Sequence, residues 1–211
     1  MVRREGFTIG KMIHETLYLK ILFILLSICL LPALGRTGAT EEMKGQEHMI
    51  LDFKNVEDKT SWQVVNDGVM GGISQSEIIL NESGGLIFRG TVSLENNGGF
   101  ASSRRGAQSY DFGDYSGLLL QVRGDGKDYQ LRIRTDDRFD GIAYRYRFKT
   151  LAGTSQVIKA YFDEFEPVFR GRIIEDAAPL SAEKIQQIGF LIADKQAGQF
   201  SIEIDWIKGL K

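Results

Sequence analysis

Short stretches in which polar and apolar residues alternate follow one another from residue 49 to the end of the chain. The clearest is 86–94, where Leu86, Phe88 and Val92 share one face and mostly polar residues share the other. Successive side chains of a β-strand point to opposite faces, so this period of two predicts strands with one buried face. The predicted strands are 49–53, 86–94, 99–105, 118–123, 129–135, 143–149, 156–162, 188–193 and 199–207.

Helical periodicity is nearly absent from the same region. Only 181–187 is typical of a short helix, with Ser181 as its N-cap. The Gly-Asp-Gly-Lys turn at 124–127 predicts a β-hairpin between its flanking strands, and 194–198 predicts a second antiparallel pair at the end of the chain. The range 163–172 is expected to be irregular. Many short strands separated by glycine-rich turns predict an all-β sandwich of jelly-roll type, in one domain over 48–211.

The stretch 62–74 contains the most unusual loop of the chain. Strand-like residues enter it, and 73–80 leaves it with partial alternation. Glycines occur in two places, after Asn66-Asp67 and at Gly71-Gly72. A tight hairpin needs only one site of positive φ, so two sites predict a shaped loop that holds Met70 in a pocket or directs backbone N–H groups at a binding partner. Met70 itself is expected to point inward and fill a gap in the interior. The residues to which we assign a structural role in this loop are Trp62, Gly68, Met70, Gly71 and Gly72.

Asp67 is the candidate ligand-binding group of this loop. Its carboxylate could bind a cation or accept a ligand hydroxyl, or it could close an Asx turn on its own backbone, which Asp commonly does in loops. The acidic turns at 125–128 and 136–140 could likewise offer oxygens to a hard cation or simply be solvated. Their spacing is not that of an EF-hand loop, so we predict no metal and no cofactor.

The first 35 residues differ in composition from the rest. A basic start, an apolar run over 21–34 and the small residues of Ala33-Leu34-Gly35 predict a cleaved signal peptide, with a retained membrane anchor as the alternative. A mitochondrial presequence fits less well, because such segments are amphipathic and poor in acidic residues. Residues 36–47 are expected to form a polar linker. The expected location is extracytoplasmic, either periplasmic or secreted.

Charge and composition exclude several classes of protein. The formal net charge is −2, and residues 1–35 contribute more basic than acidic groups, so the remainder is more acidic still. A generic nucleic-acid-binding protein would be basic, so no nucleic-acid partner is expected. Cys29 is the only cysteine, and His48 is the only histidine after the leader. A Ser-His-Asp or Cys-His site therefore lacks parts, and we predict that the protein is not an enzyme.

Several ordered motifs over about 49–209 resemble the complex I intermediate-associated protein family. They are Trp62 with 66–74, Phe88-Arg89-Gly90, 95–102, Arg123-Gly124-Asp125-Gly126 with Tyr129, Phe165-Glu166-Pro167 with Arg170-Gly171-Arg172, and Gly189-Phe190 followed by Gly198-Gln199-Phe200. The resemblance implies a galactose-binding-like jelly roll and a non-enzymatic, binding character. The best-known members of the family are mitochondrial factors that help to assemble the membrane arm of NADH:ubiquinone oxidoreductase.

Strand parity gathers arginines on one predicted surface. If 118–123, 129–135 and 143–149 are neighbours in one sheet, their arginines share its outer face, opposite the Tyr, Leu and Ile side chains. This cluster could be paired across strands with Glu203, Asp205 or the turn at 136–137, or it could bind a carboxylate, phosphate or sugar. The candidate ligand- or partner-binding residues are Asp67, Asn97, Arg123, Arg132, Arg134, Arg145, Arg147, Arg170 and Arg172.

The sequence therefore predicts a binding or assembly-factor domain with protein partners. A carbohydrate-binding module is the alternative, on fold analogy alone. Sugar binding usually uses exposed aromatic side chains, and Trp62 and Trp206 are the only tryptophans. Trp206 shares the apolar parity of Ile202 and Ile204, so we expect it to be buried, which disfavours the alternative.

Overall fold

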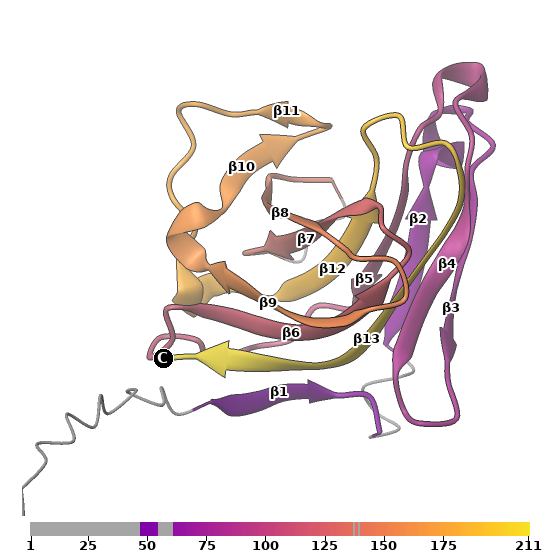
Figure 1. Ribbon diagram of the computed structural model, residues 1–211. Helices are drawn as coiled ribbons and strands as arrows, with labels where there is room; N and C mark the ends of the chain where they lie inside the picture. The colour runs from indigo at the N-terminus through magenta and orange to yellow at the C-terminus, as the bar shows by residue number, and fades with distance from the viewer. Residues whose placement is uncertain (1–46, 55–60, 137, 139) are drawn as a thin grey trace, which may run out of the picture. The chain divides into compact units, whose positions relative to one another are not determined.

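The computed structural model describes residues 47–54, 61–136, 138 and 140–211. The predicted leader lies outside the described residues, as does the predicted linker apart from Glu47. Within the described ranges the chain forms two antiparallel β-sheets (Figure 1). The predicted all-β sandwich is confirmed. The helical segments of the described residues are short 3-10 turns, too short to cross a lipid bilayer.

Sheet A holds the two ends of the described chain. Its order is β3 (Gln75–Leu80), β4 (Leu86–Val92), β13 (Gly198–Leu210), β6 (Gly117–Gly124) and β9 (Ser155–Tyr161), and β1 (His48–Asp52) also pairs with β13. β13 is the longest of these strands. It pairs with β4 along its first half and with β1 along its second half, so two strands succeed one another along one of its edges.

Sheet B forms the opposite layer of the sandwich. Its order is β11 (Arg172–Ile173), β10 (Glu166–Phe169), β8 (Ala143–Lys149), β7 (Asp128–Arg134), β12 (Gln187–Ile192), β5 (Ala101–Arg105) and β2 (Trp62–Asn66). The 3-10 turns are η1 (Asp67–Met70), η2 (Glu95–Asn97), η3 (Phe162–Glu164) and η4 (Ala182–Lys184). Strands β10 and β11 were not among the predicted strands.

The core lies between the two sheets. Sheet A contributes Phe88 and Leu120, and sheet B contributes Leu131 and Phe190, all fully buried. Because side chains alternate along a strand, the residues between these apolar positions point away from the core. On β7, Gln130, Arg132 and Arg134 therefore lie on the outer face of sheet B.

The predicted hairpin between β6 and β7 is wrong, since the two strands belong to different sheets. The turn between them is tight, with Gly126 at φ +93°, but it crosses from one layer to the other. The Asp125 carboxylate fixes this crossing. It accepts hydrogen bonds from the Tyr129 hydroxyl at 3.1 Å and from the Ser201 backbone N–H of β13 at 3.0 Å. A Gly-Asp-Gly turn thus predicts that the chain reverses its direction, but it does not predict whether the next strand joins the same sheet or the opposite one.

The predicted pairing of the last two strands is wrong for the same reason. β12 lies in sheet B and β13 in sheet A, and Asp194 and Lys195, both with positive φ, turn the chain between them. The predicted helix over 181–187 is only the turn η4, and Ser181 makes no side-chain cap hydrogen bond. Ile185 directly after η4 is buried, so the chain leaves the helical path to place that side chain in the core.

The predicted burial of Trp206 is also wrong. A register shift between Ile204 and Trp206 interrupts the alternation of β13. Ile207 points into the core instead, and Trp206 is half-buried with its ring 4.3 Å from the Lys208 Nζ atom. A bulge of this kind adds one residue and reverses the parity of the rest of the strand, which alternation alone does not reveal.

Candidate functional site

The loop after β2 is organised by the Asp67 carboxylate, which is fully buried. Asp67 Oδ1 accepts the Ser74 backbone N–H at 2.9 Å, and Oδ2 accepts the Ser74 hydroxyl at 2.5 Å. Oδ2 also accepts the backbone N–H groups of Gly99 at 2.7 Å and Phe100 at 3.3 Å. We call this set, Asp67 with Ser74, Gly99 and Phe100, the Asp67 network. It ties two loops that are far apart in the sequence.

Hydrogen bonds decide the ionisation of Asp67. Burial disfavours its charged form and would raise its pKa, but the bonds from the Ser74 hydroxyl and from the backbone of Gly99, Ser74 and Phe100 outweigh burial and lower the pKa below its usual range. The carboxylate is therefore charged and has several donors around it. The carboxylate thus accepts its hydrogen bonds from Ser74 of its own loop and from the backbone of 99–100, rather than closing an Asx turn on the residues beside it.

The glycines around Asp67 have two different roles. Gly71 adopts φ +91° and faces open space, so its requirement is conformational. Gly72 has no positive φ, but a Cβ there would collide with the carboxyl group of Asp67. At Gly98, a Cβ would lie 2.7 Å from Asp67 Oδ2. Gly72 and Gly98 thus leave room for the carboxylate, while Gly68 meets nothing within 4 Å.

The predicted interior position of Met70 is wrong, because Met70 is 59% exposed and its neighbour Val69 is 64% exposed. The loop therefore displays its apolar tip. Trp62 does pack as a structural residue, with its ring stacked 5.8 Å from that of Phe190. Asn97 is exposed in η2 with φ +59°, close to the Asp67 network in the sequence, and it does not line the large cavity on sheet B.

The outer face of sheet B carries this cavity, of about 550 Å³, which we call the groove. Strands β5, β7, β8 and β12 form its floor, and the exposed tip of η1 forms part of its rim. Its lining includes two apolar rim residues, a glutamine and several arginines: Val69, Met70, Gln130, Arg104, Arg132, Arg134, Arg145 and Arg170. Polar and apolar groups both line the groove, so it suits a ligand that has both.

One row of directly opposed residues crosses the floor of the groove. Residues paired across antiparallel strands present their side chains on the same face. The row, which we call the arginine row, runs through Gln63, Arg104, Gly189, Arg132, Arg145 and Glu166, on β2, β5, β12, β7, β8 and β10. Arg132 and Arg145 are therefore immediate neighbours of like charge, which is an unfavourable pairing.

Several groove arginines have partners. The Arg145 guanidinium, whose residue is 7% exposed, donates through Nε to Glu166 at 2.8 Å. Arg134 donates to the Gly141 carbonyl at 2.8 Å, and Arg170 donates to Asp140 at 2.6 Å. Pairing within the fold therefore accounts for part of the cluster, although Glu166 is not one of the predicted partners.

Arg132 is different, because it makes no hydrogen bond or ion pair with the described part of the chain. Its Nε is buried without a partner. Burial, followed by the positive charges of Arg145 and Arg134, lowers the pKa of Arg132 to about 10, with Asp194 opposing the change. Beside it, Gln130 donates to Asp194 at 3.1 Å, but its Oε1 is buried without a donor. An unsatisfied donor and an unsatisfied acceptor thus lie together on the groove floor.

Two predicted members of the cluster lie elsewhere. Arg123 belongs to β6 in sheet A, where it faces Glu203 with 3.8 Å between Nη1 and Oε2, so its placement beside Arg132 is wrong. Arg172 is exposed in the short edge strand β11 and does not line the groove. Arg147 shares the face of Arg145 and lies 3.5 Å from Asp194. Arg104 was missed, although the alternation of 99–105 could have placed it outward once its neighbouring strands were known.

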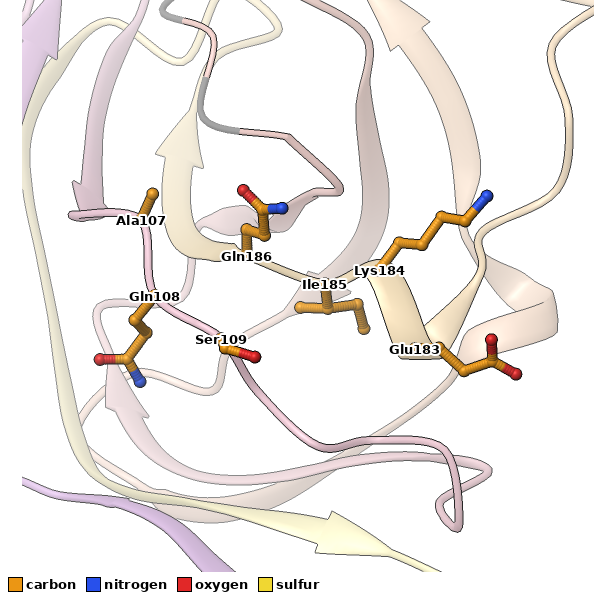
Figure 2. A pocket seen from close by; sticks show the side chains of 7 residues that line it. All are labelled: Ala107, Gln108, Ser109, Glu183, Lys184, Ile185 and Gln186. Carbon is orange, nitrogen blue, oxygen red and sulfur yellow. The ribbon is translucent and has the colours of Figure 1, made fainter.

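A second hollow, of about 300 Å³, lies between 107–109 and 183–186 (Figure 2). The side chains of Glu183 and Lys184 extend away from Gln108 in this view. The two segments are joined by the Gln108 backbone N–H and the Gln186 carbonyl at 3.0 Å. None of its described lining residues is an unpaired buried charge, so the groove is the stronger candidate. No group of three or more His, Cys, Asp or Glu that could hold a metal occurs in the described ranges.

Comparison with known proteins identifies the family. The model of the family named complex I intermediate-associated protein 30 matches residues 51–204. The chain belongs to this family. It is 34% identical over 190 residues to the mouse "Complex I intermediate-associated protein 30, mitochondrial", covering 79% of this chain and 57% of the relative. The protein of the same name from Drosophila melanogaster is 27% identical over 185 residues, covering 77% and 62%. The chain therefore spans about three fifths of the length of these two relatives.

A solved structure with the same fold is the family 11 carbohydrate-binding module from Clostridium thermocellum, in complex with a β-1,3-1,4-mixed-linked tetrasaccharide. Its TM-score is 0.60 at 17% identity, with 78% of this chain and 95% of that chain covered. At this identity the likeness shows the jelly-roll fold alone. The predicted family and the predicted galactose-binding-like fold are both confirmed.

The predicted extracytoplasmic location is wrong. The mouse and Drosophila relatives are both named as mitochondrial proteins, which contradicts a periplasmic or secreted location. The prediction relied on the apolar run, the small residues and the acidic residues of 1–35. That segment lies outside the described residues.

Proposed function

We propose that this chain is a mitochondrial, non-enzymatic assembly factor that helps to build NADH:ubiquinone oxidoreductase by binding protein partners. The observation that carries the proposal is family membership over 51–204, together with the names of the mouse and Drosophila relatives. The match covers both sheets, including β2, β5, β7, β8, β10 and β12, whose residues form the arginine row. The groove is the surface best suited to hold a partner.

The chemistry of the groove supports binding rather than catalysis. A general acid or base needs a pKa near the working pH, and a guanidinium stays protonated even when its pKa is about 10. The described carboxylates that line the groove are Asp140 and Asp194, and each lies within ion-pair distance of an arginine, Arg170 and Arg147. His48 lies on β1 of sheet A beside Tyr115, away from the groove floor.

Depletion of the protein in cells of its own source tests the proposal. Native gel electrophoresis of solubilised mitochondria should show less complete NADH:ubiquinone oxidoreductase and more of its partial assemblies. The other respiratory complexes are the internal control and should be unchanged. Re-expression of the wild-type chain should restore the complex. Normal amounts of the complete complex after full depletion would contradict the proposal.

Carbohydrate binding is the second candidate, and the fold shared with the family 11 module is the observation that favours it. The described aromatic residues that line the groove are Phe100 and Phe190, and Phe190 is fully buried. A sugar-stacking platform of exposed Trp or Tyr is not found among the described lining residues. Calorimetric titration with the mixed-linked tetrasaccharide decides between the two functions, because saturable heat of binding would favour the module function over the assembly function.

A further inference from the structure

The arginine row contains a gap at Gly189. This residue pairs with Arg104 of β5 on one side and with Arg132 of β7 on the other. A Cβ at Gly189 would collide with the Ser103 carbonyl, so the strands pack too closely for any side chain there. Arg104 and Arg132 are two strand spacings apart, roughly 9–10 Å at the backbone. Two guanidinium side chains therefore flank a strip of floor that has no side chain of its own.

The described carboxylates at the groove do not balance its positive charge. Glu166 is bonded to Arg145, Asp140 is bonded to Arg170, and Asp194 lies between Arg147 and the Gln130 amide. Arg132 has no hydrogen-bonding partner within the described chain, and its Nε is buried. Burial lowers the pKa of Arg104 and Arg134 lowers it further, while Asp140 opposes the change. Arg132 therefore leaves an uncompensated positive charge beside Gly189, where an anion would find a preformed donor.

We propose that the groove binds an acidic polypeptide segment, with one side-chain carboxylate placed over Gly189 between Arg104 and Arg132. A neighbouring apolar side chain of the segment would rest on Val69 and Met70 at the rim. This inference rests on the proposed function, because it takes the partner to be a protein. A planar carboxylate matches the fork of a guanidinium and would relieve the repulsion between Arg132 and Arg145.

The shape of the site favours a polypeptide over the other sources of negative charge. Arg132 is recessed, since its Nε is inaccessible, and a flat membrane surface does not reach a recessed group. A free phosphate would fill only the floor and would leave Val69 and Met70, 64% and 59% exposed, in water. A polypeptide carries a carboxylate and an apolar side chain a few ångströms apart. It can therefore contact the floor and the rim together.

Fluorescence anisotropy with the full chain tests the proposal. The probe is a labelled, end-blocked short peptide of alternating leucine and glutamate, and its control is the same peptide with glutamine in place of glutamate. We expect saturable binding of the glutamate peptide that weakens with added salt, and at least about tenfold weaker binding of the glutamine peptide, because a charge-assisted bidentate contact is worth roughly 1.4 kcal/mol or more. Equal binding of the two peptides would overturn the proposal.

Matched variants locate the site. Arg132→Gln should weaken binding of the glutamate peptide at least about tenfold. Its melting temperature should be unchanged or higher by roughly 2–4 °C, since it removes a repelled, half-buried charge. Arg123→Gln, on sheet A and 53% exposed, is the control and should bind as the wild type does. A loss of binding that is equal in both variants would overturn the proposal, as would a large fall in the melting temperature of Arg132→Gln.

Competition separates the possible sources of the anion. Inorganic phosphate should displace the peptide only at high concentration, and vesicles of phosphatidylglycerol should bind no better to the wild type than to Arg132→Gln. Arg132-dependent vesicle binding without peptide binding would assign the groove to a lipid headgroup and overturn the proposal. If the peptide fails to bind while depletion still lowers the amount of complete NADH:ubiquinone oxidoreductase, this inference is wrong and the proposed function stands. If the peptide binds while depletion leaves the amount of complete NADH:ubiquinone oxidoreductase normal, the groove binds acidic polypeptides but the proposed function is wrong.

Discussion

Two charged side chains lie close to the interior of this molecule, and they differ in their partners. Asp67 is fully buried and accepts four hydrogen bonds from Ser74, Gly99 and Phe100. Arg132 is half-buried, faces Arg145 across the strand pair, and has a buried Nε with no partner. Both were candidate ligand-binding residues from the sequence. Only Arg132 has bonding capacity left for a ligand.

The contrast shows that the partners of a charged group distinguish a structural site from a binding site. A structural charge has its partners within the fold, and a binding charge lacks them. A buried carboxylate with several donors is stabilised by the fold and holds two loops together. A half-buried cation beside other cations costs stability unless something outside the fold compensates. Strained or unsatisfied groups of this kind concentrate at functional sites. Substitutions at Asp67 and at Arg132 should therefore change stability in opposite directions.

Replacement of Asp67 should have the largest effect. Asp67→Asn keeps the size of the side chain but removes its charge and turns an amide N–H₂ toward at least one of the donors. We expect the free energy of unfolding to fall by about 3 kcal/mol, because buried donors lose a charged acceptor. Urea denaturation at neutral pH measures this. Asp114→Asn, in an exposed turn, is the control and should change the free energy by less than about 0.5 kcal/mol. A similar value for the two variants would contradict a structural role.

The two adjacent glycines of the loop should respond unequally. Gly72→Ala puts a Cβ into the carboxyl group of Asp67 and should cost about 2 kcal/mol, because the network must move or break. Gly71→Ala meets no atom within 4 Å and should cost about 1 kcal/mol, from positive φ alone. Thermal melts of the two variants give the comparison. If Gly71→Ala were the more harmful, backbone conformation and not space for Asp67 would explain the glycine pair.

The loss of folding stability at acidic pH should depend on the Asp67 network. The pKa of Asp67 in the folded protein lies below its usual range, so the folded state binds this proton less readily than the unfolded state does. The resulting stability is fully present above the ordinary carboxyl pKa, about 4, and is lost as the pH falls through the lowered pKa. Denaturation midpoints should therefore fall more steeply below about pH 4 in the wild type than in Asp67→Asn. Parallel curves for the two proteins would show that another carboxylate governs the acid response.

Local patterns in the sequence predicted the strands well, because alternation and turn residues are properties of neighbouring positions. The strand 143–149 has the predicted bounds, and β6, β7 and β9 differ by one residue at their ends. The pairing of strands depends on contacts that are distant in the sequence, and there the prediction failed. The turns after β6 and β12 have the residues of hairpin turns, although each connects two sheets.

The candidate site was predicted in part for the same reason. Parity placed Arg132, Arg134 and Arg145 correctly on one outer face. Sheet order was needed to exclude Arg123 and to include Arg104, and no local signal supplies it. The role of Asp67 was equally hidden, because its donors at Gly99 and Phe100 come from a loop about 30 residues away. Sequence parity finds which face a charge occupies, and only the fold shows what partners it has there.

The smallest expected effect has the opposite sign to that of Asp67→Asn. Arg132→Gln removes a cation whose neighbours on the face are mostly cations, while its amide can still reach polar groups on the groove floor. We expect the free energy of unfolding to rise by about 1 kcal/mol, since replacing a poorly compensated charge is often stabilising. Urea denaturation at low ionic strength is the sensitive measurement, because salt screens the repulsion that the substitution relieves. Arg123→Gln should change the free energy by much less, because its contact with Glu203 is long, at 3.8 Å, and the Arg123 side chain is 53% exposed. A loss of more than about 1 kcal/mol in Arg132→Gln would mean that Arg132 is satisfied by the fold as Asp67 is, and the contrast between the two residues would fail.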